Sequence, residues 1–121
     1  MRAFHFDLCG LVDLQLNDAA LDGLEWKQMG KGVSLATLKR EERTGLVLYR
    51  VEPGAPDDAF ASHAHPGGEL YLVLRGTIGD ESGSFGASSL VWLDPGSKHT
   101  PIAEGDTIVL VLWPGGVRLL D

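Results

Sequence analysis

The stretch His63-Ala64-His65-Pro66-Gly67-Gly68-Glu69 decides how this sequence is interpreted, because it holds two histidines and a carboxylate within seven residues. In an extended strand alternate side chains share a face, so His63 and His65 point to the same side. The Pro-Gly-Gly segment favours a tight reversal, since glycine tolerates positive φ angles, and this would return Glu69 to the two imidazoles. The spacing therefore predicts three polar side chains that converge on one point.

A second stretch, Asp94-Pro95-Gly96-Ser97-Lys98-His99, brings another histidine after a second turn. Two imidazoles and a carboxylate, joined by a distant third imidazole, form a suitable ligand set for a divalent transition metal. Without a cation, a buried carboxylate beside three imidazoles would be costly. We therefore expect His63, His65, Glu69 and His99 to bind one divalent metal ion, and these ligand types suit Fe, Mn, Zn or Ni.

The rest of the chain has the pattern of short β-strands. Five apolar runs have strand length, namely residues 33–38, 46–51, 70–75, 90–93 and 107–113. The run at 70–75 is nearly continuous, which is typical of a strand buried on both faces, and we expect Gly76 to end it. Alternation from Glu69 puts Tyr71 and Val73 on its metal-facing side.

Polar and glycine-rich segments separate these runs. Residues 39–45 are expected to form a polar connection, and residues 79–84 and 104–106 carry hairpin-turn chemistry. One short helix is expected at residues 18–24, with Asn17 or Asp18 as its N-cap. Evenly spaced strands without a long helix predict an all-β fold, a small barrel or sandwich, in one domain spanning residues 1–121.

Composition and charge narrow the classes of function. The 121 residues carry 10 Lys and Arg against 17 Asp and Glu, a net charge of −7, with no basic stripe, so nucleic-acid binding is not expected. The lone Cys9 cannot form an internal disulfide, as is usual in a reducing cytosol. No apolar run approaches the roughly 18 residues of a membrane helix, and the first residues carry charges unlike a signal peptide. We expect a cytoplasmic protein without membrane contact.

The two histidine stretches resemble the motifs of the cupin superfamily of small β-barrels. His63, His65, Glu69 and Gly76 match its first motif position by position, and a Pro-Gly turn before His99 is similar to the second. The full pattern, with Gly-Asp-Glu-x-Gly between the motifs, resembles the cupin domain of ChrR-type anti-sigma factors and their stand-alone relatives over about residues 22–114. The resemblance implies a single-domain cupin barrel or jelly roll.

The resemblance does not carry a sigma-factor role with it. The anti-sigma module of the ChrR type has an N-terminal helical zinc domain with paired cysteines, whereas this chain has only Cys9. The chain also departs from the family's sequence pattern at two turns. Ser88 stands in place of a usual glycine, and Asp94 stands in place of a common proline.

Two classes of function fit these residues. The favoured one is a metal-dependent enzyme of the dioxygenase or lyase type acting on a small organic molecule, because four ligands leave open positions on a six-coordinate metal. The resemblance includes stand-alone cupins such as acetylacetone dioxygenase. The alternative is a non-catalytic zinc module for sensing or binding, because the same four ligands satisfy tetrahedral zinc.

Further expectations concern the surroundings of the metal and the assembly. Tyr71 and Trp92 are candidates for lining a substrate pocket, with ordinary barrel core as the other interpretation. Ser62 and Thr100 flank the ligands and are candidates for hydrogen bonds to them. A homodimer is expected through residues 3–8, whose alternating pattern suits addition to a sheet edge.

Overall fold

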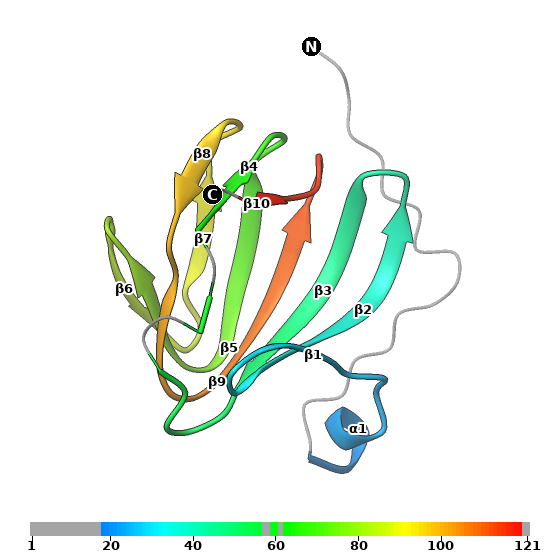
Figure 1. Ribbon diagram of the computed structural model, residues 1–121, viewed down its shortest axis with the longest axis vertical. Coiled ribbons are helices and arrows are strands. Elements are labelled where there is room, and N and C mark those ends of the chain that lie inside the picture. Colours follow the sequence, from blue (N-terminus) through cyan, green and yellow to red (C-terminus); the bar gives the residue numbers. More distant parts are fainter. Residues whose placement is uncertain (1–17, 57–58, 61, 120–121) are drawn as a thin grey trace.

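The computed structural model describes residues 18–56, 59–60 and 62–119 (Figure 1). A single short helix precedes ten strands in the described part of the chain. They are α1 (Asp18–Asp22), β1 (Lys27–Gly30), β2 (Val33–Glu41), β3 (Thr44–Val51), β4 (His63–His65), β5 (Glu69–Asp80), β6 (Gly83–Gly86), β7 (Leu90–Leu93), β8 (Ser97–His99), β9 (Ile102–Trp113) and β10 (Arg118–Leu119). The predicted all-β fold is confirmed.

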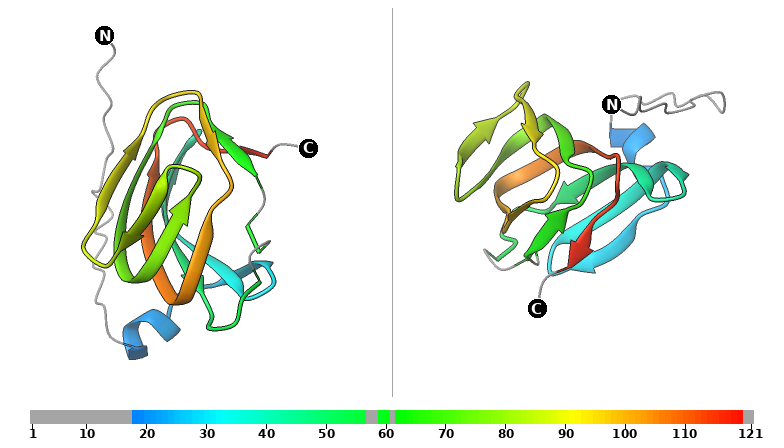
Figure 2. Two further views of the ribbon diagram at one scale, coloured as in Figure 1. Left: turned by 90° about the vertical axis from the view of Figure 1, so that its left-hand side faces the viewer. Right: turned by 90° about the horizontal axis from the view of Figure 1, so that it is seen from above.

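The strands form two antiparallel sheets. The larger has seven strands in the order β1-β2-β3-β9-β5-β6, with β7 paired to β5, and the smaller has the order β10-β4-β8. Figure 1 shows the large sheet as a curved wall with the small sheet across its upper part, and Figure 2 shows the two from the side and from above. The concave side of the large sheet therefore becomes an interior.

The large sheet carries a separate apolar cluster on each face. The inner cluster contains Val47, Tyr71, Val73, Ile78, Val109 and Val111, all less than 9% exposed. The outer cluster contains Leu21, Ala36, Leu48 and Ile108, with Trp26 packed against it. Alternation along each strand produces this division, since Val47 and Leu48 are neighbours on β3 that face opposite sides.

Strand β5 follows the predicted alternation but not the predicted end. Tyr71 and Val73 are buried in the inner cluster, and Leu74 packs on the outer one. The expectation that Gly76 ends the strand is wrong, because β5 continues to Asp80. Gly76 adopts a φ of +79° at a register shift against β9, and a Cβ there would collide with the Asp106 carbonyl and the Thr107 hydroxyl. Gly76 therefore lies opposite a bulge of β9 in a continuing strand, because this one residue of β5 faces residues 105–107 of β9.

Other predicted boundaries also shift toward longer strands. The connection expected at residues 39–45 shrinks to a two-residue turn, with Glu41 paired to Thr44 across it. The turn expected at residues 104–106 lies inside β9, whose backbone passes through Gly105 at a φ of +71°. Polar composition marked these segments as loops, whereas exposed antiparallel strands satisfy their backbone groups by pairing whatever their side chains.

The helix is shorter than expected, because α1 ends at Asp22 and not at residue 24. Leu21 nevertheless is only 1% exposed against the outer cluster. Among the described residues, none forms a helix long and apolar enough to cross a membrane. Asn17, Cys9 and the segment 3–8 of the expected dimer lie outside the described residues, so the homodimer stays a prediction.

Candidate metal centre

Three strands bring the four expected ligands together at the upper end of the interior. His63 and His65 stand two residues apart on β4, His99 ends β8, and Glu69 begins β5. Strands β4 and β8 pair in a register that places His63 opposite His99. One ligand atom from each of the four side chains lies within 4.8 Å of the others, so the structure brings the predicted set to one place.

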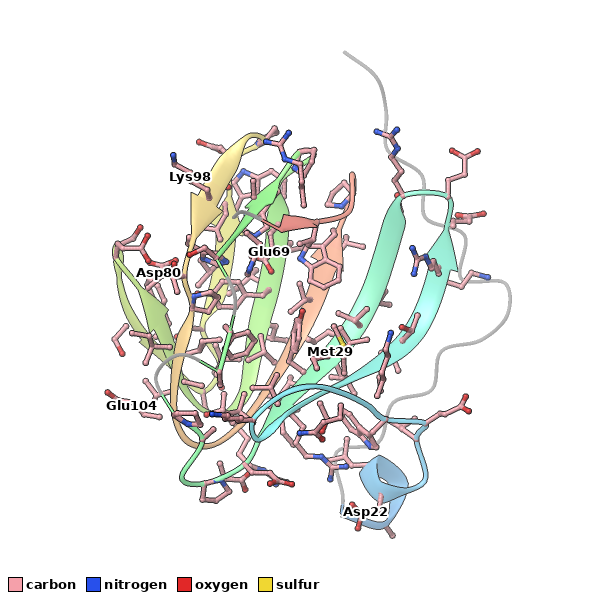
Figure 3. All side chains as sticks on the ribbon, in the orientation of Figure 1. Asp22, Met29, Glu69, Asp80, Lys98 and Glu104 are labelled. Atoms are coloured by element: carbon pink, nitrogen blue, oxygen red, sulfur yellow. The ribbon has the colours of Figure 1, made fainter. Side chains whose placement is uncertain are left out.

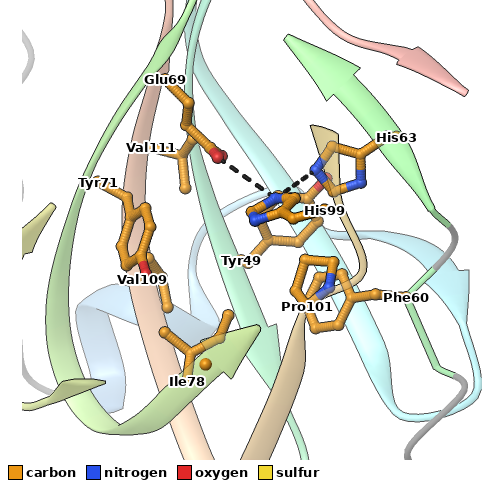
Figure 4. Close-up of a pocket in the computed structure, with 11 residues that line it drawn as sticks. Tyr49, Phe60, His63, Glu69, Tyr71, Ile78, His99, Pro101, Val109 and Val111 are labelled. Carbon is orange, nitrogen blue, oxygen red and sulfur yellow. Dashed lines mark hydrogen bonds and ion pairs between the residues drawn. The ribbon is translucent and has the colours of Figure 1, made fainter. Parts of the chain in front are cut away.

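The ligand atoms face one another closely. His99 Nε2 lies 2.9 Å from His63 Nε2 and 3.5 Å from Glu69 Oε2, as the dashed lines in Figure 4 mark. His65 Nε2 lies 3.0 Å from Glu69 Oε2. The three imidazole rings stand edge to face, with centroids 4.6–4.8 Å apart, so that each turns a nitrogen toward the common centre.

The cluster fits a cation on the evidence of its own unsatisfied atoms. His65 is fully buried and Glu69 is 4% exposed. His65 Nε2 and Glu69 Oε2 are buried without a hydrogen-bond partner among the described residues, although they face each other. The unprotonated nitrogen of a neutral imidazole and a carboxylate oxygen are both acceptors, and burying two such atoms against each other is costly. A divalent metal among them would satisfy both atoms at once.

Groups outside the cluster hold three of the four ligands. Trp113 Nε1 donates to Glu69 Oε1 over 2.9 Å, which leaves Oε2 turned toward the histidines. The Ser97 hydroxyl lies 3.1 Å from His65 Nδ1, and Asp80 Oδ2 lies 2.7 Å from His99 Nδ1. Such contacts fix the orientation and tautomer of metal-binding side chains.

The pKa of Asp80 reflects this arrangement. Burial acts to raise the pKa of the carboxyl, but its hydrogen bonds to His99 and to the backbone of Ser82 outweigh that effect and lower the pKa. Asp80 is therefore present as a carboxylate acceptor at neutral pH. Figure 3 shows Asp80 beside β8 and Glu69 below the small sheet.

Sequence reasoning missed all three supporting residues. Asp80 was assigned only to a hairpin turn, Ser97 to the turn before His99, and Trp113 to a strand end. The only sequence signal for these residues is the Gly-Asp-Glu-x-Gly pattern around Asp80. This pattern is equally typical of a simple hairpin turn, so it does not identify a functional residue. The two hydroxyls that were expected to assist, Ser62 and Thr100, hydrogen-bond to each other.

A cavity opens beside the cluster on one side (Figure 4). It is a small hollow, partly open to solvent, and His63, Glu69 and His99 form one wall. The other lining residues are almost all apolar or aromatic: Tyr49, Phe60, Tyr71, Ile78, Gly79, Pro101, Val109 and Val111. No described lysine or arginine lines it.

Two tyrosines give this cavity its polar atoms besides the cluster. Burial and, to a lesser extent, the negative charge of Glu69 raise the pKa of Tyr49 above its ordinary value. Burial, then Asp80, then Glu69 raise the pKa of Tyr71 in the same way. Both phenols therefore keep their protons at neutral pH and are available as hydrogen-bond donors.

The two pocket candidates from the sequence lie in different places. Tyr71 lines the cavity and is 5% exposed. Trp92 is 50% exposed and is not among the lining residues, because it lies on the opposite side of β7 and donates its indole N–H to Asp94 over 2.9 Å. Val91 and Leu93, its neighbours on β7, pack against the inner cluster instead.

Comparison with known proteins gives concordant results. The family model described as the ChrR cupin-like domain matches residues 18–117. The anti-sigma-E factor ChrR of Cereibacter sphaeroides is 36% identical over 84 residues, which are 69% of this chain and 38% of that protein. The chain thus corresponds to well under half the length of this curated relative.

Solved structures show the same fold. ChrR in complex with SigE from Rhodobacter sphaeroides has a TM-score of 0.63 at 33% identity, covering 77% of this chain and 51% of that chain. An acetylacetone dioxygenase from Acinetobacter johnsonii has a TM-score of 0.73 at 15% identity, covering 100% of this chain and 85% of that chain. An RmlC-like cupin from Ralstonia eutropha has a TM-score of 0.70 at 20% identity, covering 93% and 74%.

Proposed function

This chain belongs to the family of ChrR cupin-like domains, and we propose that it is a metal-dependent enzyme of the dioxygenase or lyase type acting on a small organic molecule. The observation that carries the proposal is the apolar cavity against one side of the buried cluster. A closed structural metal site needs no such space, whereas a catalytic site keeps a position open to its substrate.

The ligand set and its supports would hold a divalent metal. His63, His65 and His99 would bind through Nε2 and Glu69 through Oε2, since Trp113 occupies the other carboxylate oxygen. A bound metal of this kind supplies Lewis acidity and, as Fe²⁺, the capacity to activate O₂. Fully buried His65 forms the back of the site, because it is absent from the cavity lining while the other three ligands are exposed to it.

The cavity indicates the class of substrate. Aliphatic and aromatic walls favour a compact apolar body, and the lack of a described lysine or arginine disfavours a phosphate or a remote carboxylate. The substrate's polar atoms would face the cluster, and the protonated phenols of Tyr49 and Tyr71, which line the same cavity, would be available as hydrogen-bond donors. Acetylacetone, the substrate in the name of the solved structure from Acinetobacter johnsonii, is compact and apolar apart from its two oxygens.

The test combines metal analysis with turnover. Protein purified without added metal is analysed for its metal content. Fe²⁺-loaded protein is then assayed for oxygen consumption and for loss of substrate with acetylacetone and other small carbonyl compounds. Ile78→Phe narrows the cavity and should lower kcat/KM at least tenfold without loss of metal. Ile102→Phe is the matched control, because Ile102 lies on β9 with 40% exposure outside the cavity. Equal rates in both variants, or no turnover with any loaded metal, would remove the enzyme proposal.

A non-catalytic zinc module is the second candidate. Its support is the 36% identity with the anti-sigma-E factor ChrR, which has been solved in complex with SigE. This candidate expects zinc in the purified protein and no turnover with Fe²⁺. Both candidates expect Ile78→Phe to keep its metal, so the metal identity and the turnover distinguish the two.

A further inference from the structure

The hairpin between β5 and β6 reaches the candidate metal centre through a carboxylate outside the ligand set. We infer that Asp80 is a positioning residue: it fixes the tautomer of His99 so that the Nε2 lone pair faces the other ligands. The inference rests on the proposed metal function and adds to it a residue that sets the binding competence of one ligand.

The geometry of the contact determines where the proton sits. Asp80 Oδ2 lies 2.7 Å from His99 Nδ1, and the Asp80 side chain is only 3% exposed. A carboxylate can only accept, so Nδ1 must carry the hydrogen. A neutral imidazole has a single N–H, and Nε2 of His99 is then left with a lone pair directed at the ligand cluster.

A second contact fixes the carboxylate itself. The backbone N–H of Ser82 donates to Asp80 Oδ1 over 2.7 Å, within the turn of the same hairpin. Oδ1 of Asp80 therefore accepts a hydrogen bond from the turn, and Oδ2 contacts His99. The hairpin thus holds the Asp80 carboxylate in a fixed orientation as an acceptor for His99 Nδ1.

This arrangement gives Asp80→Asn an unusual consequence. The Ser82 N–H still requires an oxygen at the Oδ1 position, which directs the amide NH₂ of the asparagine at His99 Nδ1. That nitrogen must then accept, and the imidazole proton moves to Nε2, where it points at His63 and Glu69. The isosteric variant forces the tautomer that cannot bind metal, whereas Asp80→Ala only leaves the tautomer free.

Glu81 provides a matched control on the same turn. Its Oε1 accepts the backbone N–H of Thr100 over 3.0 Å, so it also links the hairpin to the chain next to His99. Glu81→Gln removes the same charge from the neighbouring residue, but it touches no ligand side chain. A purely electrostatic or purely structural role of the hairpin predicts similar effects for both residues.

The first experiment titrates metal-free protein with Co²⁺ and follows its visible absorption. We expect Asp80→Asn to weaken Co²⁺ binding about 10- to 100-fold, Asp80→Ala to weaken it no more than Asn does, and Glu81→Gln to change it less than about threefold. Equal losses in Asp80→Asn and Glu81→Gln, or a milder loss in Asn than in Ala, would overturn the inference. Failure of the unaltered protein to bind Co²⁺ would instead overturn the metal function on which it rests.

The second experiment needs no metal, and its main result comes from the unaltered protein. Long-range ¹H–¹⁵N correlation spectra of ¹⁵N-labelled, metal-free protein at neutral pH identify the tautomer of each histidine. We expect His99 to be protonated at Nδ1 in the unaltered protein and in Glu81→Gln, and at Nε2 in Asp80→Asn. Protonation of His99 at Nε2 in the unaltered protein would contradict the proposal whatever happens to the folding of the variants.

Discussion

The two faces of the large sheet are built from the same strands but differ in what they pack. On the outer face Leu48 and Ile108 are buried under Leu21 of α1 in an aliphatic cluster. On the inner face Val47 and Val109 share the interior with a cavity and a buried cluster of ionisable side chains. The difference indicates that the outer face serves packing alone, whereas the inner face combines an apolar cluster with a site.

The largest effect expected from this comparison is on the outer face. Leu48 is fully buried, so Leu48→Ala should remove about 2–5 kcal/mol of stability through lost transfer free energy and a cavity. Its side chain points away from the site, so the metal content of protein that remains folded should not change. Urea unfolding measures the loss of stability, and metal analysis measures the metal content of the folded variant. A loss of metal from folded protein would show that the two faces of the sheet are coupled.

The reverse pattern is expected on the inner face. His65→Ala should lower metal affinity by at least about a hundredfold, since it removes a ligand with no replacement. The unfolding free energy of the metal-free protein should change far less than it does in Leu48→Ala. His5→Ala is the matched substitution outside the ligand set and should retain its metal. Equal metal content in the two variants would defeat the assignment of the ligands.

Larger side chains should also destabilise the two faces of the sheet to different extents, with smaller effects than Leu48→Ala. Ala36→Ile overfills the outer cluster and should cost about 1–3 kcal/mol. Val111→Ile adds one methylene next to the cavity, where there is space, and should cost less than about 1 kcal/mol. Denaturant midpoints of the two variants provide the comparison, which fails if the inner substitution proves the more harmful.

The smallest expected effect is a gain in stability. In Glu69→Gln the Trp113 N–H keeps an oxygen at Oε1, so the new amide group points at the unpaired His65 Nε2 and donates to it. Metal-free protein should gain about 1 kcal/mol, because one hydrogen bond forms and a buried charge disappears. Metal binding should be lost at the same time.

Thermal melting of metal-free Glu69→Gln and of unaltered protein measures this gain. Glu104→Gln, an exposed carboxylate on β9, is the control and should leave both stability and metal binding unchanged. A destabilised Glu69→Gln variant would mean that the carboxylate is satisfied without a cation.

Strand positions followed from local pattern more reliably than strand ends. Apolar alternation located the cores of β2, β3, β5, β7 and β9, because burial on one face leaves a period of two in the sequence. The ends were wrong at Gly76 and at residues 104–106, where glycine marks bulges within continuing strands. A glycine that permits a positive φ has the same local signature in a turn and in a bulge, so only the partner strand distinguishes them.

By itself, the sequence predicted the candidate ligand set and the family, because alternation and a short turn bring His63, His65 and Glu69 near one another. The tertiary structure alone decided which groups support those ligands and where the cavity opens. Asp80 and His99 are 19 residues apart, and Glu69 and Trp113 are 44 apart. Contacts over such separations depend on strand register and on the curvature of the sheet, which set distances that no local pattern encodes.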